Sequence, residues 1–371
     1  MKKALVVLPT YNEAGFIKKL IEDILLQNEK VKNWEIEVLV NDSASTDDTA
    51  KIVKELHKKY PKNLYLLETK KEGLGRAYHQ AFVYAIEHIQ PFVIIQMDAD
   101  FSHNPNDIPL FLDKIARGAD FVVGARYIKG GSIPSNWGIH RKILSVIANL
   151  IIRFGFMKLN IHEWTNGFRA IKIWLIKDSL DHIKNYSGYV FQIAMLDYAI
   201  KKGAMLAEIP NNFIDRKYGK SKIFVSQYIF QILSYILLNS SFIKFIVVGL
   251  LGFAVDFSFA YLFINKSHIA KVRANIYSAE VAIFFNFLLN NFWSFKDKKI
   301  TGGFFSFLTK FISFNFVSLG SIIIQAVGLS LALKFFGDGA NSWIIYKVAI
   351  IAFIVIPYSY ILYNKFIWKK K

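Results

Sequence analysis

The chain has 371 residues, with 46 Lys and Arg against 28 Asp and Glu, and therefore a formal net charge of +18. Hydrophobic residues make up 53% of the chain and the mean hydropathy is +0.30, which excludes a disordered chain and an ordinary soluble protein. The absence of cysteine excludes disulfides, cysteine nucleophiles and thiolate metal sites. We therefore expect about two domains, one of them in lipid, and any metal held by oxygen or imidazole ligands.

Residues 1–225 alternate short β-branched runs with amphipathic segments, an order typical of a parallel α/β domain. The first apolar run reaches Pro9 too soon to be the core of a signal peptide, so we expect a cytoplasmic N-terminus. Functional residues in such a sheet lie at the carboxyl ends of the strands. The predicted strands are 4–8, 36–40, 64–67, 92–97 and 121–123, and the predicted helices are 14–27, 46–60, 75–89 and 107–117.

The rest of the chain is organised for a membrane. Four apolar spans at 242–264, 275–295, 311–333 and 343–363 each approach the roughly 20 residues that cross a bilayer. Lysines after the second span and in the C-terminal tail predict that both face the cytoplasm. Residues 225–238 predict an amphipathic helix at the membrane interface, or alternatively the last helix of the α/β domain. We divide the chain into an α/β domain at 1–225, an interfacial helix and linker at 226–241, and a four-helix membrane domain at 242–371.

The membrane half also suggests an internal repeat. Lys244 and Phe245 begin the first span as Lys310 and Phe311 begin the third. An Asn-containing segment ends the second span at 291–293 and nearly ends the fourth at 364–366. This correspondence predicts a duplication of two helices, with coincidence in a Phe-, Ile- and Asn-rich sequence as the alternative.

Acidic and polar residues follow the predicted strands. Asp98 and Asp100 end the fourth one, and residues two apart in a strand face the same way, so both carboxylates can meet one hard cation while a diphosphate fills its other positions. Polar turns also follow the first two strands at 8–13 and 40–47, where backbone N–H groups can bind a nucleotide. The alternative for these turns is helix capping by Asn12 or Ser45.

Taken together, the motifs LPTYNE, NDSASTDDT, KEGLGRAY and MDADFSHNP resemble glycosyltransferase family 2, whose members have the GT-A fold. The later motifs VGARY, RKILS, TNGFR, GYVFQ and DRKYGKSK are similar to those of dolichol-phosphate mannose synthases. The membrane half resembles the four-span GtrA-like domains fused to some of these synthases. The resemblance implies an α/β, Rossmann-like GT-A catalytic domain followed by an interfacial helix and a four-helix transmembrane domain.

The resemblance also implies a donor site. Tyr11 would offer an aromatic face to the nucleoside, Glu13 would accept from ribose hydroxyls, and Asp42 would accept from a base N–H. Asn41 stands where the family usually has another acid. The implied nucleotide-binding residues are Pro9, Tyr11, Glu13, Asp42, Lys71, Asp98 and Ala99, and the implied ligands of Mg²⁺ or Mn²⁺ are Asp98, Asp100 and Ser102. Ser102 occupies a position where some relatives carry Gln.

The implied acceptor is a polyprenyl monophosphate, an anion that needs no strong general base. Arg126 and Arg141 would chelate its phosphate in fork geometry, with Ser145 as a neutral donor. Asp100 and these two arginines are the residues expected to carry catalysis. The donor sugar and diphosphate are assigned to Gln192, Arg216, Ser221 and Lys222, with the acceptor phosphate as the alternative for the last three. Other cations near the membrane are expected to attract anionic lipid headgroups rather than nucleic acid.

The sequence thus predicts an inverting, metal-dependent glycosyltransferase of the cell membrane, multi-pass, with its catalytic domain and both termini in the cytoplasm. It would transfer mannose from GDP-mannose to dolichyl or another polyprenyl phosphate, giving the β-linked lipid-phosphate sugar and GDP for glycosylation. An oligomer is compatible with the sequence. The alternatives are the same chemistry with UDP-glucose and, from a different class, a lipid-linked-sugar transporter. A processive polysaccharide synthase is disfavoured because no QxxRW-like motif is present.

Overall fold

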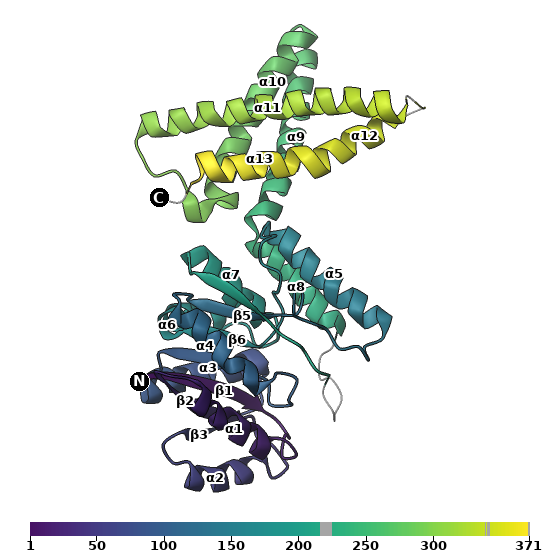
Figure 1. Cartoon of the computed structure of the whole chain (residues 1–371). Helices are drawn as coiled ribbons and strands as arrows, with labels where there is room; N and C mark the ends of the chain where they lie inside the picture. The colour runs from purple at the N-terminus through teal and green to yellow at the C-terminus, as the bar shows by residue number, and fades with distance from the viewer. Residues whose placement is uncertain (216–224, 338, 340–341, 370–371) are drawn as a thin grey trace. The chain divides into compact units, whose positions relative to one another are not determined.

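The computed structural model describes residues 1–215, 225–337, 339 and 342–369 (Figure 1). The chain forms two compact units, Met1–Tyr235 and Ile236–Lys371. Three predicted donor-site residues, Arg216, Ser221 and Lys222, lie outside the described residues.

A seven-stranded sheet organises the first unit, in the order β3-β2-β1-β4-β6-β5-β7. Neighbouring strands are parallel except for β6, which is antiparallel to both β4 and β5. The sheet is therefore mixed, and the prediction of a parallel sheet was wrong at this one strand. The strands are β1 (Lys2–Thr10), β2 (Trp34–Asp42), β3 (Leu64–Glu68), β4 (Val93–Gln96), β5 (Phe121–Ala125), β6 (Arg169–Lys172) and β7 (Leu206–Pro210).

All five predicted strands are present, but some end elsewhere. β1 and β2 run two residues further than predicted, because Pro9 and Thr10 pair with Asn41 and Asp42. β4 is shorter, since the chain leaves the strand after Gln96. The prediction that Asp98 and Asp100 point to the same side of a strand was therefore wrong. Both lie in the loop that follows β4.

Helices cover both faces of the sheet (Figure 1). Ala4, Val6 and Leu8 of β1 belong to a buried core that includes residues of α1, α2 and α4. On the other face, α3 contacts β1 and β2 and also packs against α6, which contacts α7. The helices of this unit are α1 (Ile17–Leu25), α2 (Thr49–Lys59), α3 (Leu74–Tyr84), α4 (Ile108–Ala116), α5 (Ile139–Phe156), α6 (Ile173–Ile183), α7 (Phe191–Lys202) and α8 (Val225–Asn239). Short helical turns lie at Leu26–Lys30, Ala85–Ile89 and Pro105–Asp107.

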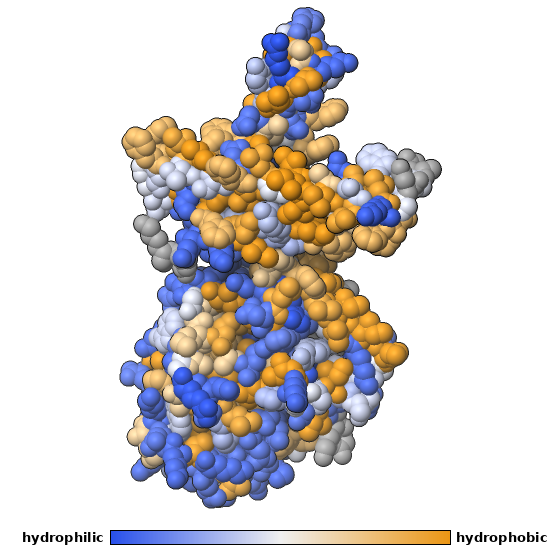
Figure 2. All heavy atoms as spheres, turned by 45° about the horizontal axis from the view of Figure 1, so that its top comes forward, coloured by the Kyte–Doolittle hydropathy of each residue, from blue (hydrophilic) through white to orange (hydrophobic). Residues whose placement is uncertain are grey.

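Helix α5 carries a broad apolar face that the first unit does not bury. Eight of its large hydrophobic residues are exposed, namely Ile139, Ile143, Leu144, Val146, Ile147, Leu150, Ile151 and Phe154. Figure 2 shows hydrophobic residues gathered on the side where α5 lies, while much of the rest of this unit is hydrophilic. Phe156 of α5 contacts Tyr235 of α8, with ring centroids 6.1 Å apart, and α8 exposes Phe230 as well. So large an apolar patch is typical of a surface that meets an apolar environment.

Among the described residues of the second unit, four helices are long and apolar enough to cross a membrane, in agreement with the predicted number of spans. They are Ser241–Asn265, Lys271–Ser294, Phe304–Phe336 and Ser342–Ile367. The first and third are the single helices α9 and α11. The second consists of α10 (Lys271–Leu289) and the π-helical turn η4 (Asn290–Ser294), and the fourth of α12 (Ser342–Ile350), η6 (Ile351–Val355), α13 (Ile356–Leu362) and η7 (Tyr363–Ile367).

Small and polar residues join these apolar helices, as is typical of packing without a hydrophobic driving force. A side chain at Gly252 of α9 would overlap with Asn286 of α10, so glycine permits the close approach. The hydroxyls of Ser321 and Ser359 lie 2.8 Å apart and join α11 to α13.

Candidate active site

The turns after β1 and β2 are joined by hydrogen bonds. Asn12 N–H donates to Ser45 Oγ at 2.9 Å, and Thr46 N–H donates to Asn12 Oδ1 at 2.8 Å. Asn12 adopts a left-handed backbone with φ 60°, which asparagine tolerates. The N-cap residues of α1 and α2, Phe16 and Asp48, make no side-chain capping bond. Asn12 and Ser45 therefore join the two turns to each other instead of capping helices.

Asp42 lies at the end of β2 and is 2% exposed. Its Oδ1 accepts from the hydroxyls of Thr10 (3.1 Å) and Ser45 (2.5 Å), and its Oδ2 accepts from Ser45 N–H (3.0 Å). Asn41, for which the family resemblance implied an acid, is fully buried, donates to a backbone carbonyl of α3 and accepts from the Thr69 hydroxyl at 2.9 Å. The amide thus makes neutral contacts that a second carboxylate could not make without a proton.

Four residues predicted to bind the nucleotide lie around these turns. Pro9 is half-buried at the end of β1, and Glu13, also half-buried, donates its N–H to Thr49 Oγ1 at 2.9 Å. The Lys71 ammonium lies 3.5 Å from the centre of the Tyr11 ring, a close cation–π contact. A base that stacked on this face of Tyr11 would have to displace Lys71.

The two glycines of the KEGLGRAY loop lie against the backbone of another segment. A side chain at Gly73 would overlap with the Ser187 carbonyl oxygen, and one at Gly75 would overlap with that of Tyr186. Gly75 N–H also donates to Ser187 O at 2.8 Å. The two glycines therefore allow the start of α3 to approach residues 186–187, a role that the sequence analysis did not foresee.

The two carboxylates after β4 fit a divalent cation. The Asp98 side chain is 39% exposed, and Asp100 Oδ1 accepts from Ser102 N–H at 3.0 Å. A methyl group at Gly167 would lie 3.6 Å from both Asp98 Oδ1 and Gln192 Nε2, so this glycine leaves a cradle beside the carboxylate. Carboxylates are hard oxygen ligands that Mg²⁺ and Mn²⁺ prefer. No group of three His, Asp or Glu that could hold a metal occurs among the described residues, so substrate oxygens would have to complete the coordination.

Ser102 and Ala99 are buried beside these carboxylates, with 2% and 4% exposure. Gln192, at the start of α7, is equally buried at 2% exposure, and its backbone carbonyl accepts from Arg169 Nη1. Arg169 also donates to the carbonyls of Asn166 and Trp164, both at 2.7 Å. Burial lowers the pKa of Arg169 to about 10. This guanidinium fastens the segment before β6 to the helix that carries Gln192.

Arg126 lies at the end of β5 in a buried ion pair. Its Nε donates to Glu163 Oε2 at 2.8 Å and its Nη2 to Glu163 Oε1 at 3.0 Å and Thr165 Oγ1 at 2.8 Å. Burial alone would raise the pKa of Glu163, but the adjacent guanidinium more than offsets this and lowers it below the ordinary value. Within the described part of the chain no hydrogen bond joins Nη1, which leaves that nitrogen as the group that could bind phosphate.

Arg141 stands in a more open place. Its guanidinium carbon lies 3.9 Å from the centre of the Trp137 ring, and its Nη1 lies 3.4 Å from Asp215 Oδ2. The side chain is 46% exposed. Ser145, one turn further along α5, is hydrogen-bonded to the Tyr127 hydroxyl at 2.6 Å.

Phe213 brings the acidic and cationic parts of the site together. Its ring centroid lies 5.7 Å from the Arg126 guanidinium carbon, 5.7 Å from the His103 ring and 5.9 Å from the Trp137 ring. Trp137 makes a cation–π contact with Arg141, and His103 Nδ1 accepts from the backbone N–H of Asp98. The Phe213 ring therefore contacts Arg126 directly and is linked to Asp98 through His103 and to Arg141 through Trp137.

Several residues of this arrangement were not among the site residues predicted from the sequence. They are His103, Trp137, Glu163, Asn166, Phe213 and Asp215. His103 stands within the MDADFSHNP motif, Asn166 within TNGFR and Asp215 at the start of DRKYGKSK, so the motifs themselves offered a signal for these three. No pattern of spacing singles out Glu163 or Phe213.

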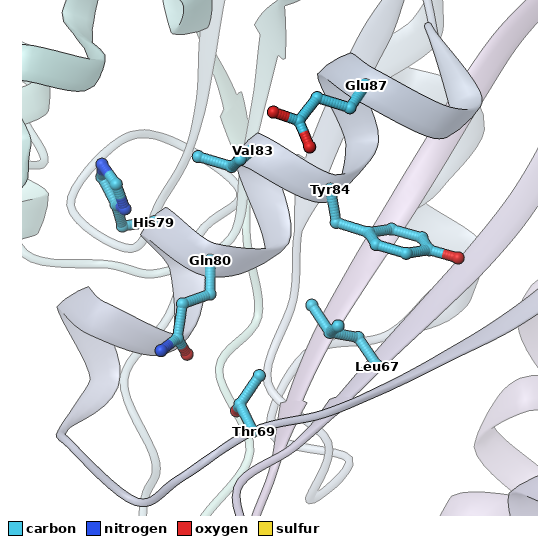
Figure 3. Close-up of a pocket in the computed structure, with 7 residues that line it drawn as sticks. All are labelled: Leu67, Thr69, His79, Gln80, Val83, Tyr84 and Glu87. Carbon is cyan, nitrogen blue, oxygen red and sulfur yellow. The ribbon is translucent and has the colours of Figure 1, made fainter.

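A separate cavity of about 320 Å³ lies between the end of β3 and α3 (Figure 3). Burial and the nearby Arg76 and Lys184 lower the pKa of its His79. The lining residues, Leu67, Thr69, His79, Gln80, Val83, Tyr84 and Glu87, include none of the predicted site residues. This cavity is therefore distinct from the carboxylate and arginine cluster.

The comparisons with known proteins match both units. Residues 5–183 match the family Glycosyl transferase family 2, and residues 244–368 match the family GtrA/DPMS, transmembrane domain. A dolichol-phosphate mannosyltransferase of Pyrococcus furiosus is 33% identical over 318 residues, which are 83% of this chain and 85% of the relative. A polyprenol monophosphomannose synthase of Mycolicibacterium smegmatis is 33% identical, covering 60% of this chain and 81% of its own.

Among solved structures, a glucosyl-3-phosphoglycerate synthase from Mycobacterium tuberculosis, in complex with Mn²⁺, UDP and phosphoglyceric acid, is 18% identical with a TM-score of 0.46. The match covers 64% of this chain and 78% of that one.

The first unit is a GT-A-like domain and the second a four-helix membrane domain, which together define a membrane-bound glycosyltransferase. The chain belongs to glycosyl transferase family 2, in the branch that carries a GtrA/DPMS membrane domain and whose relatives are polyprenyl-phosphate mannosyltransferases.

Proposed function

We propose that the chain transfers mannose from GDP-mannose to a polyprenyl phosphate such as dolichyl phosphate, in a metal-dependent reaction with inversion. The observation that carries the proposal is the convergence of Asp98, Arg126 and Arg141 around Phe213. It pairs a site suited to a cation-bound diphosphate with one suited to a second phosphate. The relatives named as polyprenyl-phosphate mannosyltransferases support mannose as the sugar.

The donor would lie over the joined turns. Tyr11, Glu13, Asp42 and Lys71 would contact the nucleoside and its phosphates, as their place around these turns suggests. The exposed carboxylate of Asp98 and that of Asp100, with Ser102 beside them, would hold Mg²⁺ or Mn²⁺. Such a bound cation neutralises charge on the departing nucleoside diphosphate. Gln192 would contact sugar hydroxyls from the Gly167 cradle, and Arg216, Ser221 and Lys222 are proposed to close over the diphosphate.

The acceptor phosphate would bind between Arg126 and Arg141, with Ser145 as a neutral donor. One phosphate oxygen attacks the anomeric carbon from the face opposite the diphosphate. The bond from that carbon to the GDP oxygen breaks, and GDP leaves with the bonding electrons, so the product is β-linked. Because the acceptor is already an anion, the residues need only position it and stabilise charge.

The location of the reaction follows from the apolar surfaces. We place the first unit and both termini in the cytoplasm, because lysines gather after the second span and at the C-terminus. The exposed apolar face of α5 begins beside Arg141 and Ser145. A face of this kind buries itself at the boundary of a bilayer, where a lipid-linked phosphate would be presented.

The test is transfer of radiolabelled sugar to polyprenyl phosphate in detergent with Mn²⁺, with GDP-mannose and UDP-glucose compared side by side. We expect label in the lipid phase from GDP-mannose alone, and none when EDTA replaces the metal. Label from UDP-glucose alone would support the proposed type of reaction but contradict mannose as the transferred sugar. Label from neither would favour the lipid-linked-sugar transporter.

Asp100→Asn provides the matched variant, since it removes one charge at constant shape. It should lose turnover while its melting temperature remains that of the wild type. Asp23→Asn, which alters a half-buried carboxylate of α1 that pairs with Lys19, is the control and should transfer normally. Normal turnover of Asp100→Asn would overturn the metal assignment and leave the donor assignment standing.

A further inference from the structure

His103 is fully buried and is bonded at both ring nitrogens. Its Nδ1 accepts from the backbone N–H of Asp98 at 3.1 Å, and its Nε2 lies 2.9 Å from Asn166 Oδ1. A donor at one nitrogen and an acceptor at the other select the tautomer with its proton on Nε2. The ring also stacks on Phe168, with centroids 4.9 Å apart. His103 therefore has one orientation, and that orientation fixes the backbone of Asp98.

The amide of Asn166 is held just as firmly. Its Nδ2 donates to the Gly124 carbonyl and to Asn211 Oδ1, at 2.9 Å for the latter. Its Oδ1 therefore faces His103, and it also lies 3.3 Å from the N–H of Phe168. Two donated and two accepted bonds satisfy the whole side-chain amide.

Asn166 is also joined to the cationic side of the site. Its backbone N–H donates to Glu163 Oε1 at 3.1 Å, and the same oxygen accepts from Arg126 Nη2 at 3.0 Å. A continuous path of hydrogen bonds thus runs from Arg126 through Glu163, Asn166 and His103 to the backbone of Asp98. All of these residues except Asp98 are buried.

We propose that His103 and Asn166 are positioning residues, which hold Asp98 in the orientation that the donor metal requires and couple it to Arg126 through Glu163. This inference deepens the proposed function and rests on it for the identity of the metal and nucleotide. Removal of a group that supports a metal ligand typically lowers metal affinity roughly 10- to 100-fold. Here the support acts mainly on the backbone of Asp98, whose side chain is 39% exposed and whose Oδ2 lies 4.0 Å from His103 Nε2.

Two substitutions separate the two bonds of the His103 ring. His103→Asn retains an oxygen near the place of Nδ1 but cannot reach Asn166. His103→Gln places an amide nitrogen near Nε2 but lacks the acceptor beside Asp98. We expect both variants of the full-length protein in detergent to bind GDP with Mn²⁺ about tenfold more weakly by calorimetry. Deuterium uptake of a peptide spanning 97–104, measured without ligand, should rise more in His103→Gln.

The metal distinguishes positioning from a general loosening of the fold. GDP affinity in EDTA should be unchanged in both variants, because the path supports the metal ligand and not the nucleoside turns. Weaker GDP binding in EDTA, by the same factor as with Mn²⁺, would overturn the positioning role. Unchanged uptake together with unchanged Mn²⁺–GDP affinity would overturn it as well.

The coupling is tested by Glu163→Gln alone and combined with His103→Asn. Because both act on one path, the loss of Mn²⁺–GDP affinity in the double variant should be smaller than the product of the two single losses. Losses that simply multiply would overturn the coupling while leaving the His103 result intact.

Controls keep these outcomes separate. His57→Gln alters a histidine on α2 whose Nδ1 lies 2.6 Å from the Leu64 carbonyl, and it should change neither measurement. If the His103 variants do not fold, Asn166→Ser tests the same path with the imidazole intact, and no rise in uptake at 97–104 would overturn the proposal. A wild-type protein that binds no GDP with Mn²⁺ would contradict the proposed donor, whereas the uptake measurement would still report on the path.

Discussion

Arg126 and Arg141 are assigned to the same phosphate, but their surroundings differ. Arg126 is buried and its charge is balanced by Glu163 through two hydrogen bonds. Arg141 is 46% exposed, its guanidinium carbon lies 3.9 Å from the centre of the Trp137 ring, and its Nη1 lies 3.4 Å from Asp215 Oδ2. A weakly held guanidinium at the surface can change partner at little cost, whereas a buried bidentate pair cannot. We therefore expect Arg141 to supply most of the attraction for an incoming phosphate, and Arg126 to fix its position.

Arg141→Ala should accordingly impair acceptor use. Hydrogen bonds to charged groups contribute about 1.5–3 kcal/mol, so kcat/KM for polyprenyl phosphate should fall roughly 10- to 100-fold while GDP binding with Mn²⁺ is retained. Asp215→Asn should act in the opposite direction and lower the acceptor KM, because its carboxylate competes with phosphate for Arg141. Steady-state kinetics with varied lipid measure both. Arg117→Ala, at the exposed end of α4, is the control, and an equal loss of donor binding in Arg141→Ala would contradict the assignment.

The residues that sequence reasoning could find are those that act at the ends of strands. Asp42, Asp98 and Asp100 could be predicted because each is a polar residue directly after an apolar run. Their assigned roles as ligands remain predictions. Glu163 could not be predicted, because its partner Arg126 lies 37 positions away and only the tertiary fold makes it an ion pair. His103 likewise acquires its second bond from a residue 63 positions further along the chain.

At the scale of elements, the segments that could be predicted are those that are long enough to show a regular spacing of apolar residues. Helices α1 to α4 and strands β1 to β5 have clear apolar periods and were predicted, with shifts at their ends. β6 has only four residues and begins with Arg169, so its pattern is not that of a buried strand. Its place between β4 and β5 buries it, and its antiparallel direction depends on tertiary packing that no local pattern encodes.

The second and fourth membrane helices end in the same way, which extends the predicted repeat. Each closes with a π-helical turn, η4 and η7, followed by a buried aromatic residue. These aromatic residues, Phe295 and Trp368, stack on each other with centroids 4.5 Å apart and planes 14° apart. The asparagines of the two turns differ: Asn291 Oδ1 accepts from Trp368 Nε1 and Ile300 N–H, whereas Asn364 Oδ1 accepts from Lys298. Asn291 thus joins the end of the second membrane helix to the end of the fourth.

Asn291→Ala should therefore destabilise the membrane unit more than Asn364→Ala. The first leaves a buried indole N–H and a backbone N–H without their acceptor, at a cost of about 1–3 kcal/mol each, whereas Lys298 can turn toward water. Unfolding of the detergent-solubilised protein measures the order of stability. Asn275→Ala is the matched control, since that side chain bonds only within α10 among the described residues and is exposed. Equal losses at 291 and 364 would contradict this account.

At the scale of the whole molecule, the chain joins two units built on different physical principles. The first has a sheet with its own core of buried apolar residues, so its fold draws on the hydrophobic effect. The second exposes large apolar side chains along all four of its long helices, as its composition predicted, and requires lipid or detergent. The membrane helices could be predicted from long apolar spans with few errors, because the thickness of a bilayer fixes the length that a spanning helix needs.

A fragment of residues 1–240 should for this reason retain nucleotide binding and lose efficient use of long lipids. The carboxylates, the joined turns and both arginines all lie in the first unit, so affinity for GDP with Mn²⁺ should be that of the full chain. Transfer to a long-chain polyprenyl phosphate in vesicles should fall roughly 100-fold, because the membrane unit no longer keeps enzyme and acceptor in one bilayer. Transfer to a short, water-soluble analogue should be unaffected, which separates loss of tethering from damage to the site. Undiminished transfer to the long lipid would mean that α5 and α8 suffice to hold the enzyme at the membrane.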